Sequence, residues 1–489
     1  MAISVPDLSA DQKLVYDGIK EWLAGRRSPT LTVGGFGGTG KSTVVSVLAN
    51  ELVPMGPIAF CAFTGKASSV LARKLKEAGV LTASRISAKM PLGPTPYCGT
   101  IHGLIYRPCD ACMEEEEHKH TLRGPACRAE GAVVPPRQHC MRDPSVTGCC
   151  AGEGRCDCEC VVCSPPEGGE EKCLACDPPP PVKRDGPCSQ CHGARYFRRT
   201  KVDRDYRLIV VDEASMVDDS MLGDLLKFDV PILAVGDHGQ LPPVKGVGGL
   251  MKHPDLRLEK IHRQAEGNPI IRLSKAIREK GYINPRLADG DRIRILSKDD
   301  LDEWIGEVFP RRFAAGGREA LGAALIAWTN RSRCALNEKV RAALGFDDQP
   351  PKKGETMICL KNEAPIYNGM RGILSYDAEM VGTDANPRWK SEVNFVEDGL
   401  TAEPIMSHAQ FFAEKTVDYD RCRELGIPWR QLGQLYDFGF AMTCHKAQGS
   451  QFDEVGVLVD GLRAMSDNDR RAWLYTAVTR ASERVVIFQ

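Results

Sequence analysis

The segment Gly35-Phe36-Gly37-Gly38-Thr39-Gly40-Lys41-Ser42, followed by Thr43, fits the pattern G-x-x-x-x-G-K-[ST]. The strand-like stretch Leu31 to Val33 precedes it and a helix-like stretch over 41–52 follows it, which is the context that a phosphate-binding loop requires. Glycines let backbone N–H groups surround phosphate oxygens; Lys41 is expected to reach the outer phosphates and Ser42 to hold Mg²⁺. The segment therefore predicts a nucleotide-binding α/β domain.

A pair of carboxylates supplies the second half of such a site. Asp212 and Glu213 follow the apolar run Leu208 to Val211, at the strand end where parallel sheets bind ligands. We expect Asp212 to bind Mg²⁺ through water and Glu213 to orient or deprotonate the attacking water. Gln240 follows the next apolar run and is a candidate sensor of the terminal phosphate, while a turn around Pro242 explains it equally well.

The 489 residues alternate strand-like and helix-like segments, which indicates an α/β class with parallel sheets. We expect a first ATPase domain in residues 1–108 and 200–257 and a second in 258–349 and 436–489. Short strands and turns predict a small β-domain in residues 350–435. With 64 basic and 65 acidic residues and a net charge of −1, any nucleic acid must be held by local basic patches.

Residues 109–199 interrupt this rhythm and hold fourteen of the 20 cysteines. The segment has few large aliphatic residues, so metal binding is expected to fold it in place of a hydrophobic core. Four C-x-x-C pairs fit tetrahedral Zn²⁺ sites, and four thiolates per ion would allow about two to three ions. The pairs are Cys109 with Cys112, Cys160 with Cys163, Cys173 with Cys176, and Cys188 with Cys191. Further candidates are Cys127, Cys140, Cys149, Cys150, Cys156 and Cys158.

We favour a site that combines Cys109 and Cys112 with Cys188 and Cys191, because it closes the segment at its base. Disulfides and an iron–sulfur cluster are alternative uses of the same thiols. No apolar run approaches the ~18–20 residues of a membrane span, and the first residues lack the features of a signal peptide. We therefore expect a cytoplasmic protein, bacterial or from a phage-infected host, with no membrane partner.

Taken in order, the motifs outside the cysteine-rich segment resemble those of the superfamily 1B DNA helicases of the RecD/Dda type. The first half carries Gln12, Phe63-Thr64-Gly65-Lys66-Ala67, Thr100-Ile101-His102, Asp212-Glu213-Ala214-Ser215 and the stretch Gly236 to Pro243. The second half carries His262-Arg263-Gln264, Thr443-Cys444-His445-Lys446-Ala447-Gln448-Gly449-Ser450 and Leu474-Tyr475-Thr476-Ala477-Val478-Thr479-Arg480-Ala481. Eight motifs in this order make a chance match negligible.

The resemblance implies two RecA-like motor domains that hydrolyse ATP at the cleft between them. It implies an SH3-like domain in the second. The zinc-binding insert lies in the first domain and is the main departure from the family pattern, which has a small subdomain with a strand-splitting pin at that place. The resemblance also implies that Gln12 reads adenine, that Arg263 and Arg480 are arginine fingers, and that Gly449 lies at the nucleotide. The residues that it assigns to DNA are Thr64, Lys66, Thr100, His102, Thr443, His445 and Lys446. The implied enzyme is a monomer that moves 5′ to 3′ on single-stranded DNA and acts at duplex junctions in replication, repair or recombination.

Two other functions stay open. One is a nucleic-acid-stimulated translocase or remodelling ATPase that displaces proteins without unwinding, and the other is a zinc-dependent interaction scaffold. The presence of Lys41, Asp212 and Glu213 argues against the scaffold. For the cysteine-rich insert we expect either a strand-splitting pin, or its brace, or a docking module for a protein partner or duplex DNA.

Overall fold

The computed structural model describes residues 5–25, 28–81, 96–108, 119–120, 171–172, 196–198, 206–243, 250–260, 268–347, 349–360, 366–383, 386–407 and 435–489. The chain forms two compact units. The larger comprises Met1–Ile105 and Thr200–Gln489, and the smaller comprises Tyr106–Arg199.

The larger unit begins with a six-stranded sheet in which every pair of neighbours is parallel. The strand order is β10 (Leu256–Leu258), β1 (Thr30–Gly35), β9 (Ile232–Gly236), β8 (Leu208–Asp212), β2 (Ile58–Ala62) and β3 (Tyr97–Thr100). The central strands are almost continuous apolar runs because helices cover both faces of such a sheet. Their carboxyl ends meet at one edge and bring β1, β8 and β9 together there.

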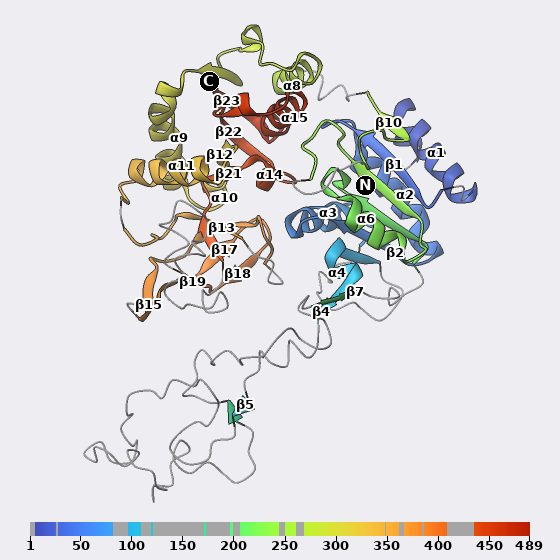
Figure 1. The fold of residues 1–489 in the computed structure, drawn as a ribbon, viewed down its shortest axis with the longest axis horizontal. Coiled ribbons are helices and arrows are strands. Elements are labelled where there is room, and N and C mark those ends of the chain that lie inside the picture. The colour runs from blue at the N-terminus through green and yellow to red at the C-terminus, as the bar shows by residue number, and fades with distance from the viewer. Residues whose placement is uncertain are drawn as a thin grey trace, which may run out of the picture. The chain divides into compact units, whose positions relative to one another are not determined.

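Helices of this part are α1 (Ala10–Gly25), α2 (Lys41–Leu52), α3 (Gly65–Glu77), α4 (Ile101–Ile105) and α6 (Asp219–Leu226), with single 3-10 turns η1 (Val5–Asp7), η2 (Val53–Met55) and η3 (Ala214–Met216). Apolar side chains of α1, α2 and α3 form one core with β1, β2 and β8. Figure 1 shows these blue helices beside the strands that they cover. The Thr64 hydroxyl caps α3 by accepting from the Ala67 N–H at 3.1 Å, which fixes where that helix begins.

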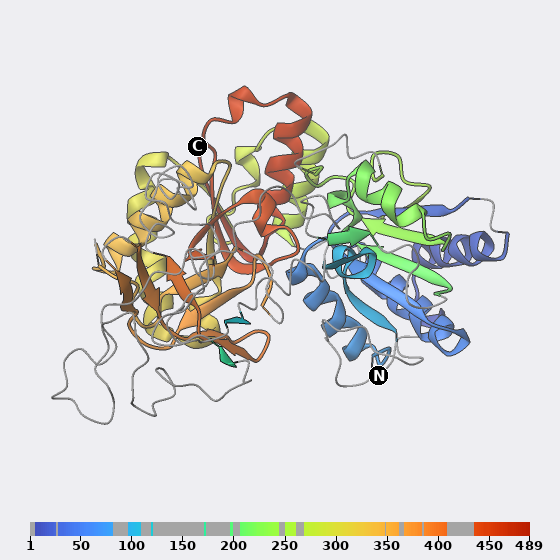
Figure 2. The same ribbon diagram turned by 60° about the horizontal axis from the view of Figure 1, so that its bottom comes forward.

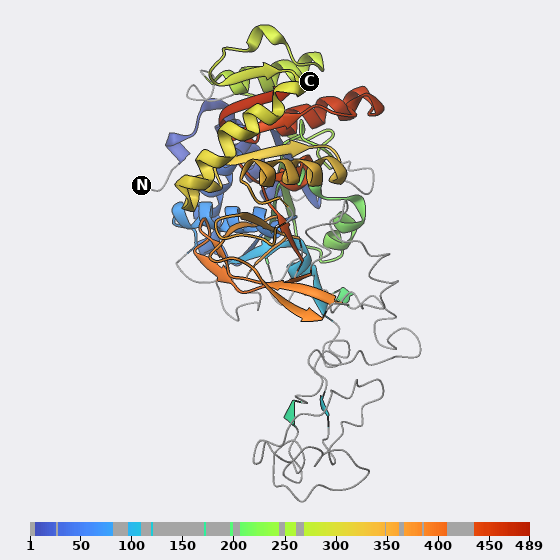
Figure 3. The same cartoon turned by 90° about the vertical axis from the view of Figure 1, so that its left-hand side faces the viewer.

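A second parallel sheet has five strands, in the order β11 (Ile293–Leu296), β23 (Ala481–Phe488), β22 (Phe452–Leu458), β12 (Ala323–Ala327) and β21 (Ala441–Thr443). Segments from the middle and the end of the chain thus lie side by side in one sheet, as the views in Figures 2 and 3 show. Its helices are α8 (Pro269–Lys280), α9 (Leu301–Ala315), α10 (Gly317–Ala320), α11 (Asn330–Ala343), α14 (Cys444–Ala447) and α15 (Asp467–Val478), with 3-10 turns η4 (Pro285–Leu287), η5 (Lys298–Asp300) and η7 (Leu462–Ala464).

The two faces of this sheet are covered by different helices. Alternate side chains of β12 point to opposite faces. Leu325 packs in a core with α9 and α11, whereas Ile326 packs in a core with α8 and α15. The two parallel sheets confirm the α/β class.

Antiparallel strands recur through the described residues of the region in which a small β-domain was predicted. A five-stranded sheet has the order β18 (Leu400–Ala402), β17 (Val393–Phe395), β14 (Arg371–Leu374), β13 (Thr356–Cys359) and β20 (Tyr436–Phe438). A three-stranded sheet has the order β15 (Glu379–Thr383), β16 (Asn386–Lys390) and β19 (Ile405–Ser407). The larger of these sheets includes a strand beyond residue 435, because β20 pairs with β13.

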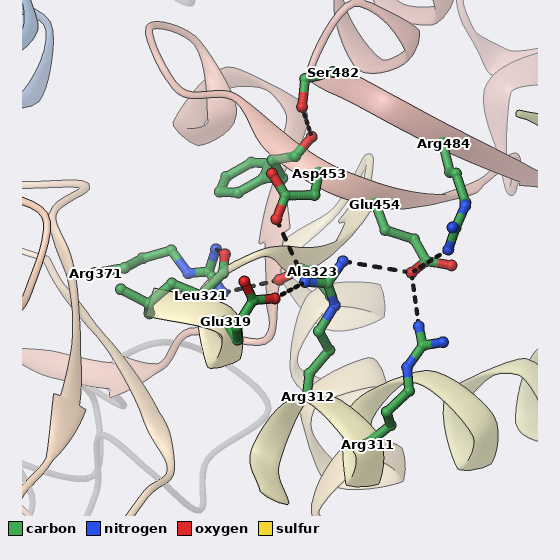
Figure 4. A network of polar contacts seen from close by, with 11 residues as sticks. Arg311, Arg312, Glu319, Leu321, Ala323, Arg371, Asp453, Glu454, Ser482 and Arg484 are labelled. Carbon is green, nitrogen blue, oxygen red and sulfur yellow. Dashed lines mark hydrogen bonds and ion pairs between the residues drawn. The ribbon is translucent and has the colours of Figure 1, made fainter. Parts of the chain in front are cut away.

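Buried charges fix the antiparallel sheet to the start of β12 (Figure 4). Arg371 of β14 donates from both terminal nitrogens to the carbonyls of Leu321 and Ala323, each at 3.0 Å. Burial lowers the pKa of this guanidinium to about 10. Nearby, Arg312 of α9 pairs with acidic residues at 2.8, 3.4 and 3.7 Å, namely Glu319, Asp453 and Glu454. Charge-assisted bonds from Arg371 therefore hold the antiparallel sheet against β12, and those from Arg312 hold α9 against α10 and β22.

The smaller unit is described at four short strands. β4 (Tyr106–Pro108) pairs with β7 (Tyr196–Arg198), and β5 (Lys119–His120) pairs with β6 (Glu171–Lys172), both antiparallel. The β4–β7 pair is the stem through which the chain enters and leaves this unit. Among the helices that the structure describes, none has the length and apolar character needed to span a bilayer.

The zinc sites predicted from the cysteine pattern receive no support from the structure. All fourteen candidate ligands lie outside the described residues: Cys109, Cys112, Cys127, Cys140, Cys149, Cys150, Cys156, Cys158, Cys160, Cys163, Cys173, Cys176, Cys188 and Cys191. Within the described part of the chain, no group of three or more His, Cys, Asp or Glu side chains is placed to hold a metal ion. The cysteines described there are free thiols buried among other side chains, namely Cys61, Cys98, Cys334, Cys359 and Cys444.

Candidate nucleotide and nucleic-acid site

The phosphate-binding loop lies between the end of β1 and the start of α2. Gly38 and Gly40 have φ values of +83° and +80°, a region that favours glycine. A Cβ on Gly35 would lie 2.7 Å from the Thr39 hydroxyl, so the first glycine is needed for close packing of the loop. The Lys41 ammonium donates to the carbonyls of Gly35 at 2.6 Å and Phe36 at 3.1 Å.

One cavity of about 560 Å³ collects most of the predicted nucleotide residues. Predicted site residues on its walls are Gly37, Gly38, Gly40, Lys41, Ser42, Lys66, Asp212, Glu213, Gln240, Gly449 and Arg480. They come from the ends of β1, β8 and β9, from α3, and from the loops that follow α14 and α15. The cavity is therefore built from both parallel sheets.

The carboxylate pair stands at the end of β8. Glu213 has φ +51°, an uncommon value for a residue other than glycine. Burial raises the pKa of Glu213 and the neighbouring Asp212 raises it further, while Lys41 and Arg480 oppose this. Within the described chain, the buried Oε2 of Glu213 has no hydrogen-bond partner. Such an oxygen fits a site that accepts a proton from water in the bound state.

Oxygen donors for a divalent cation are present on the same walls. The Ser42 hydroxyl and the Asp212 carboxylate both line the cavity, and oxygen ligands are those that Mg²⁺ prefers. The residue types therefore fit a magnesium ion. The Ser42 Oγ accepts from the Lys74 ammonium at 3.0 Å, so this ammonium would have to leave the hydroxyl before a magnesium ion could bind it.

Gln12 lies in α1 and is buried. Its amide nitrogen donates to the Thr39 carbonyl at 3.4 Å, and its amide oxygen accepts from the Ser9 N–H at 3.1 Å. The Ser9 hydroxyl accepts from the Gln12 N–H at 3.3 Å, which completes a reciprocal cap at the start of the helix. The predicted adenine-reading residue is thus held directly against the phosphate loop. Thr43, which the sequence also assigns to the nucleotide site, follows Ser42 in the first turn of α2.

Asp237 and Gln240 follow β9, and their side chains meet. Asp237 is buried; its Oδ1 accepts from the Gly239 N–H at 2.9 Å and its Oδ2 from the Gln240 amide at 3.4 Å. The Oε1 of Gln240 is buried and has no hydrogen-bond partner among the described residues. Gln240 therefore presents a free acceptor beside the carboxylates, which the sequence alone left undecided.

Tyr475 of α15 crosses from the second parallel sheet to the first. Its hydroxyl donates to Oδ2 of Asp237 at 2.7 Å and accepts from the Gly37 N–H at 3.2 Å. Burial raises the pKa of this phenol well above its usual value, and the charge of Asp237 raises it further. One side chain thus links the phosphate loop, the loop after β9 and the carboxy-terminal helix.

The peptide groups of Leu241 are held on both sides by residues beside the second parallel sheet. Its N–H donates to the Thr476 hydroxyl at 3.0 Å, and its carbonyl accepts from the Gln448 amide at 3.2 Å. Both partners belong to motifs that the sequence singled out, but neither was assigned this contact. The loop after β9 is therefore fastened to two separate motifs of the other sheet.

Phe36 adds an aromatic contact to the same junction. The Arg278 guanidinium of α8 lies 3.2 Å from the centroid of the Phe36 ring. His238 and Tyr475 have ring centroids 4.1 Å and 6.2 Å from it. This cluster was missed by sequence reasoning, because Phe36 occupies a variable position of the loop pattern.

Of the two predicted arginine fingers, the structure describes Arg480. Its guanidinium donates to the carbonyls of Thr476 at 3.1 Å and Ser450 at 3.2 Å and to the Thr479 hydroxyl at 3.1 Å. It lines the cavity although it is mostly buried. Arg263, with its neighbours in the same motif, lies outside the described residues.

The residues predicted to contact DNA have different surroundings. Thr64 and Thr100 cap the starts of α3 and α4, where the Thr100 hydroxyl accepts from the Gly103 N–H at 3.1 Å. His102 is exposed, and its ring lies 6.4 Å from that of Phe63 in an edge-on arrangement. These side chains stand together at the carboxyl edge of β2 and β3.

The corresponding residues of the second sheet surround α14. Thr443 precedes this helix, and His445 and Lys446 lie in it, all three partly buried. Burial lowers the pKa of the Lys446 ammonium to about 8, with Arg333 lowering it and Asp437 opposing. Lys66 differs from the rest, because it is buried and its ammonium pairs with Glu397 at 3.4 Å.

Two families of domains match the chain. Residues 23–246 match the AAA domain family AAA_19, and residues 438–488 match the UvrD-like helicase C-terminal domain. Together they span the phosphate loop, the carboxylate pair and the last two motifs. Solved structures found by comparison include the Pif1 helicase from Candida albicans, with TM-score 0.44, 15% identity and coverage of 100% of this chain and 95% of that chain. A Bacteroides Pif1 bound to ssDNA gives TM-score 0.43, 15% identity and coverage of 99% and 92%.

Curated relatives are RecD subunits of RecBCD enzymes. That of Mycolicibacterium smegmatis is 27% identical over 323 residues, which are 60% of this chain and 51% of the relative. That of Mycobacterium tuberculosis is 26% identical over 332 residues, which are 60% of this chain and 52% of the relative. The chain thus spans about half the length of the curated relatives that it matches. The chain is thus similar to the AAA_19 domain family, to UvrD-like helicase C-terminal domains and to part of RecD subunits.

Proposed function

We propose that the protein is an ATP-dependent DNA helicase that moves 5′ to 3′ on single-stranded DNA. One observation carries the proposal: the phosphate loop, the carboxylate pair and Arg480 line a single cavity built from both parallel sheets. An arginine on one domain can stabilise the charge of a nucleotide bound to the other domain only when the two domains come together. Hydrolysis would then be tied to closure of the cleft.

The chemistry assigned to each side chain follows from its position. Lys41 and the loop amides would neutralise phosphate charge, and Ser42 with Asp212 would hold Mg²⁺, which would supply further positive charge to the phosphates. Glu213 would accept a proton from the attacking water, a role that its raised pKa suits. Gln240 would use its free oxygen to orient that water.

The contacts of Leu241 and Tyr475 would transmit changes at the nucleotide to the residues predicted to bind DNA. Both connect the loop after β9 to motifs of the second sheet. A change at the terminal phosphate would move this loop and the second sheet together. Alternating grip by residues such as Thr64 and Lys446 would turn that movement into steps along a strand. Each base-pair step to be opened costs about 1.4 kcal/mol in stacking.

The remaining parts of the proposal rest on the sequence and the family. The antiparallel sheets between residues 356 and 438 would be the SH3-like domain that clamps the strand, and the enzyme would act as a cytoplasmic monomer at duplex junctions. The direction of movement is taken from the family. Gln12 would read adenine, and Arg263 would be the second arginine finger.

For the cysteine-rich insert we propose structural zinc, on the strength of its four C-x-x-C pairs alone. Cys109 directly follows β4, and Cys191 precedes β7 by five positions, so the favoured site of Cys109, Cys112, Cys188 and Cys191 would stand next to the stem. Metal analysis of the full-length protein should find about two to three zinc ions per chain. Iron with visible absorbance would identify an iron–sulfur cluster, and no metal would disprove the proposal.

The helicase proposal is tested by ATPase rates with and without single-stranded DNA, in parallel with unwinding of duplexes that bear a 5′ or a 3′ tail. Wild type should show DNA-stimulated hydrolysis and should unwind from the 5′ tail, and Lys41→Ala should lose both. Stimulation without unwinding would establish a translocase that displaces proteins. Absence of stimulation by DNA or RNA would overturn the motor, and zinc with no hydrolysis would favour a scaffold.

A further inference from the structure

The turn between β17 and β18 carries two neighbouring carboxylates. The pairing of Phe395 with Leu400 leaves residues 396–399 as the acidic hairpin tip, which contains Glu397 and Asp398. The Asp398 N–H donates to the Phe395 carbonyl at 3.0 Å, and Gly399 has φ +64°. A tight turn therefore presents these carboxylates at the end of a hairpin.

Glu397 contacts a cation that the sequence assigns to DNA. Lys66 is only 9% exposed, and its ammonium lies 3.4 Å from Oε2 of Glu397. Burial lowers the pKa of Lys66, and the charges of Glu397 and Asp398 oppose this. A buried ammonium needs an anion, and this internal carboxylate supplies it.

Further cations act on the same carboxylate. Burial would raise the pKa of Glu397, but Lys66, Arg371 and Arg73 outweigh it and hold that pKa below its usual range. Lys66, Arg73 and Glu397 also line the cavity that contains the phosphate loop. The acidic hairpin tip thus occupies a positive region that continues into the nucleotide site.

Lys66 stands where a nucleic-acid backbone is expected, one residue after the start of α3 and two after Thr64. A backbone phosphate and a carboxylate both offer oxygen acceptors to an ammonium, and each group carries one negative charge. The two cannot occupy Lys66 together without placing like charges side by side.

We propose that the acidic hairpin tip is an internal competitor of the nucleic-acid backbone, with Glu397 occupying Lys66 until a phosphate of the bound strand replaces it. This inference rests on the proposed helicase function. Displacement of the tip also removes a carboxylate from the wall of the nucleotide cavity. Hydrolysis is therefore restrained in the absence of DNA and released when the strand takes Lys66.

The test compares full-length wild type with Glu397→Gln, which keeps the size of the side chain and removes its charge. The variant should hydrolyse ATP without DNA at a rate raised roughly fivefold or more, bind fluorescent oligo(dT) more tightly, and show a smaller stimulation ratio. Glu403→Gln removes one charge from the same region outside the cavity wall and should behave as wild type. Asp398→Asn should move both readouts in the direction of Glu397→Gln by a smaller factor.

The outcomes separate the two proposals. If DNA does not stimulate ATP hydrolysis by wild type, the helicase proposal fails, and the proposal that Glu397 competes with DNA fails with it. If wild type is stimulated and both tip variants keep the wild-type basal rate and oligo(dT) affinity, the competitor alone is wrong. Loss of DNA stimulation with no gain in basal rate, in a variant that melts at the wild-type temperature, would show that Glu397 supports Lys66 and does not compete with DNA.

Discussion

The hydroxyl of Tyr475 donates a 2.7 Å hydrogen bond to Oδ2 of Asp237, joining side chains from the two parallel sheets of the larger unit. Both residues are buried, so the bond forms where water cannot replace it. The same hydroxyl accepts from the Gly37 N–H of the phosphate loop. The Tyr475 hydroxyl therefore connects the phosphate loop directly to the carboxy-terminal helix α15.

Substitution Tyr475→Phe should remove this link while keeping the ring in place. The buried Asp237 loses its strongest donor, so the free energy of unfolding should fall by about 1–3 kcal/mol. DNA-stimulated hydrolysis should fall at least about fivefold, because the loop after β9 loses one tie to the second sheet. Denaturant unfolding and stimulated ATPase rates measure the two effects. Tyr282→Phe, at a side chain that is 51% exposed, is the control, and a stimulated rate equal to wild type in Tyr475→Phe would exclude the coupling role.

The raised pKa of Glu213 predicts the acidic limb of the pH–rate profile. Glu213 acts as its carboxylate, so hydrolysis should decline as pH falls through a pKa above the 4.5 of an ordinary glutamate. Glu213→Gln should lower the rate about 10²–10⁴-fold and remove this limb from the residual activity. Steady-state rates across pH, with ATP saturating at each pH, provide the measurement. A limb that persists unchanged in the variant would assign the titration to another group.

A comparison of Gly449 with Gly345 separates the effect of a close contact from the effect of backbone strain. This residue has φ +75°, and a Cβ there would lie 3.3 Å from the Cβ of Ala67. Gly345 has φ +77° with nothing within 4 Å of its added Cβ. Both alanine variants should lose about 1–2 kcal/mol of stability from backbone strain. Only Gly449→Ala should also lower ATPase activity, and equal activities in the two variants would show that the Ala67 contact has no functional weight.

Stability of the larger unit should depend on the buried ion pair between Arg341 and Glu355. Arg341 donates from Nε to Glu355 at 2.8 Å, and Glu355 is completely buried. Glu355→Ala leaves a buried guanidinium without its anion and should cost about 3–5 kcal/mol. Lys339→Ala breaks an exposed pair with Asp302 and should cost no more than about 1 kcal/mol. Urea titrations of both variants give the comparison, and similar losses would mean that Arg341 finds another partner.

Local elements of the fold could be predicted from the sequence because their signals are local. The helix expected over 41–52 begins at Lys41 and ends at Leu52. Strand runs such as Leu208 to Val211 are apolar because both faces are covered. The boundary near residue 435 was harder, since Tyr436–Phe438 resembles a strand of either sheet and only its pairing assigns it.

Contacts between distant positions could not be read in the same way. The Asp237 partner of Tyr475 is 238 positions away, and the Glu397 partner of Lys66 is 331 positions away. The sequence around Lys66 does not show which distant residues bury this side chain. Lys66 was therefore predicted as a DNA contact, with no indication that Glu397 pairs with it. The free oxygen of Gln240 likewise depends on how Asp237 occupies its amide nitrogen.

The pairing of β4 with β7 has a consequence for how this chain can change in length. Antiparallel neighbours are about 5 Å apart, so whatever sequence lies between them starts and finishes at adjacent points. A turn of a few residues would satisfy the same geometry as the whole cysteine-rich segment. The segment between β4 and β7 can therefore be replaced by one of another length while these two strands keep their register.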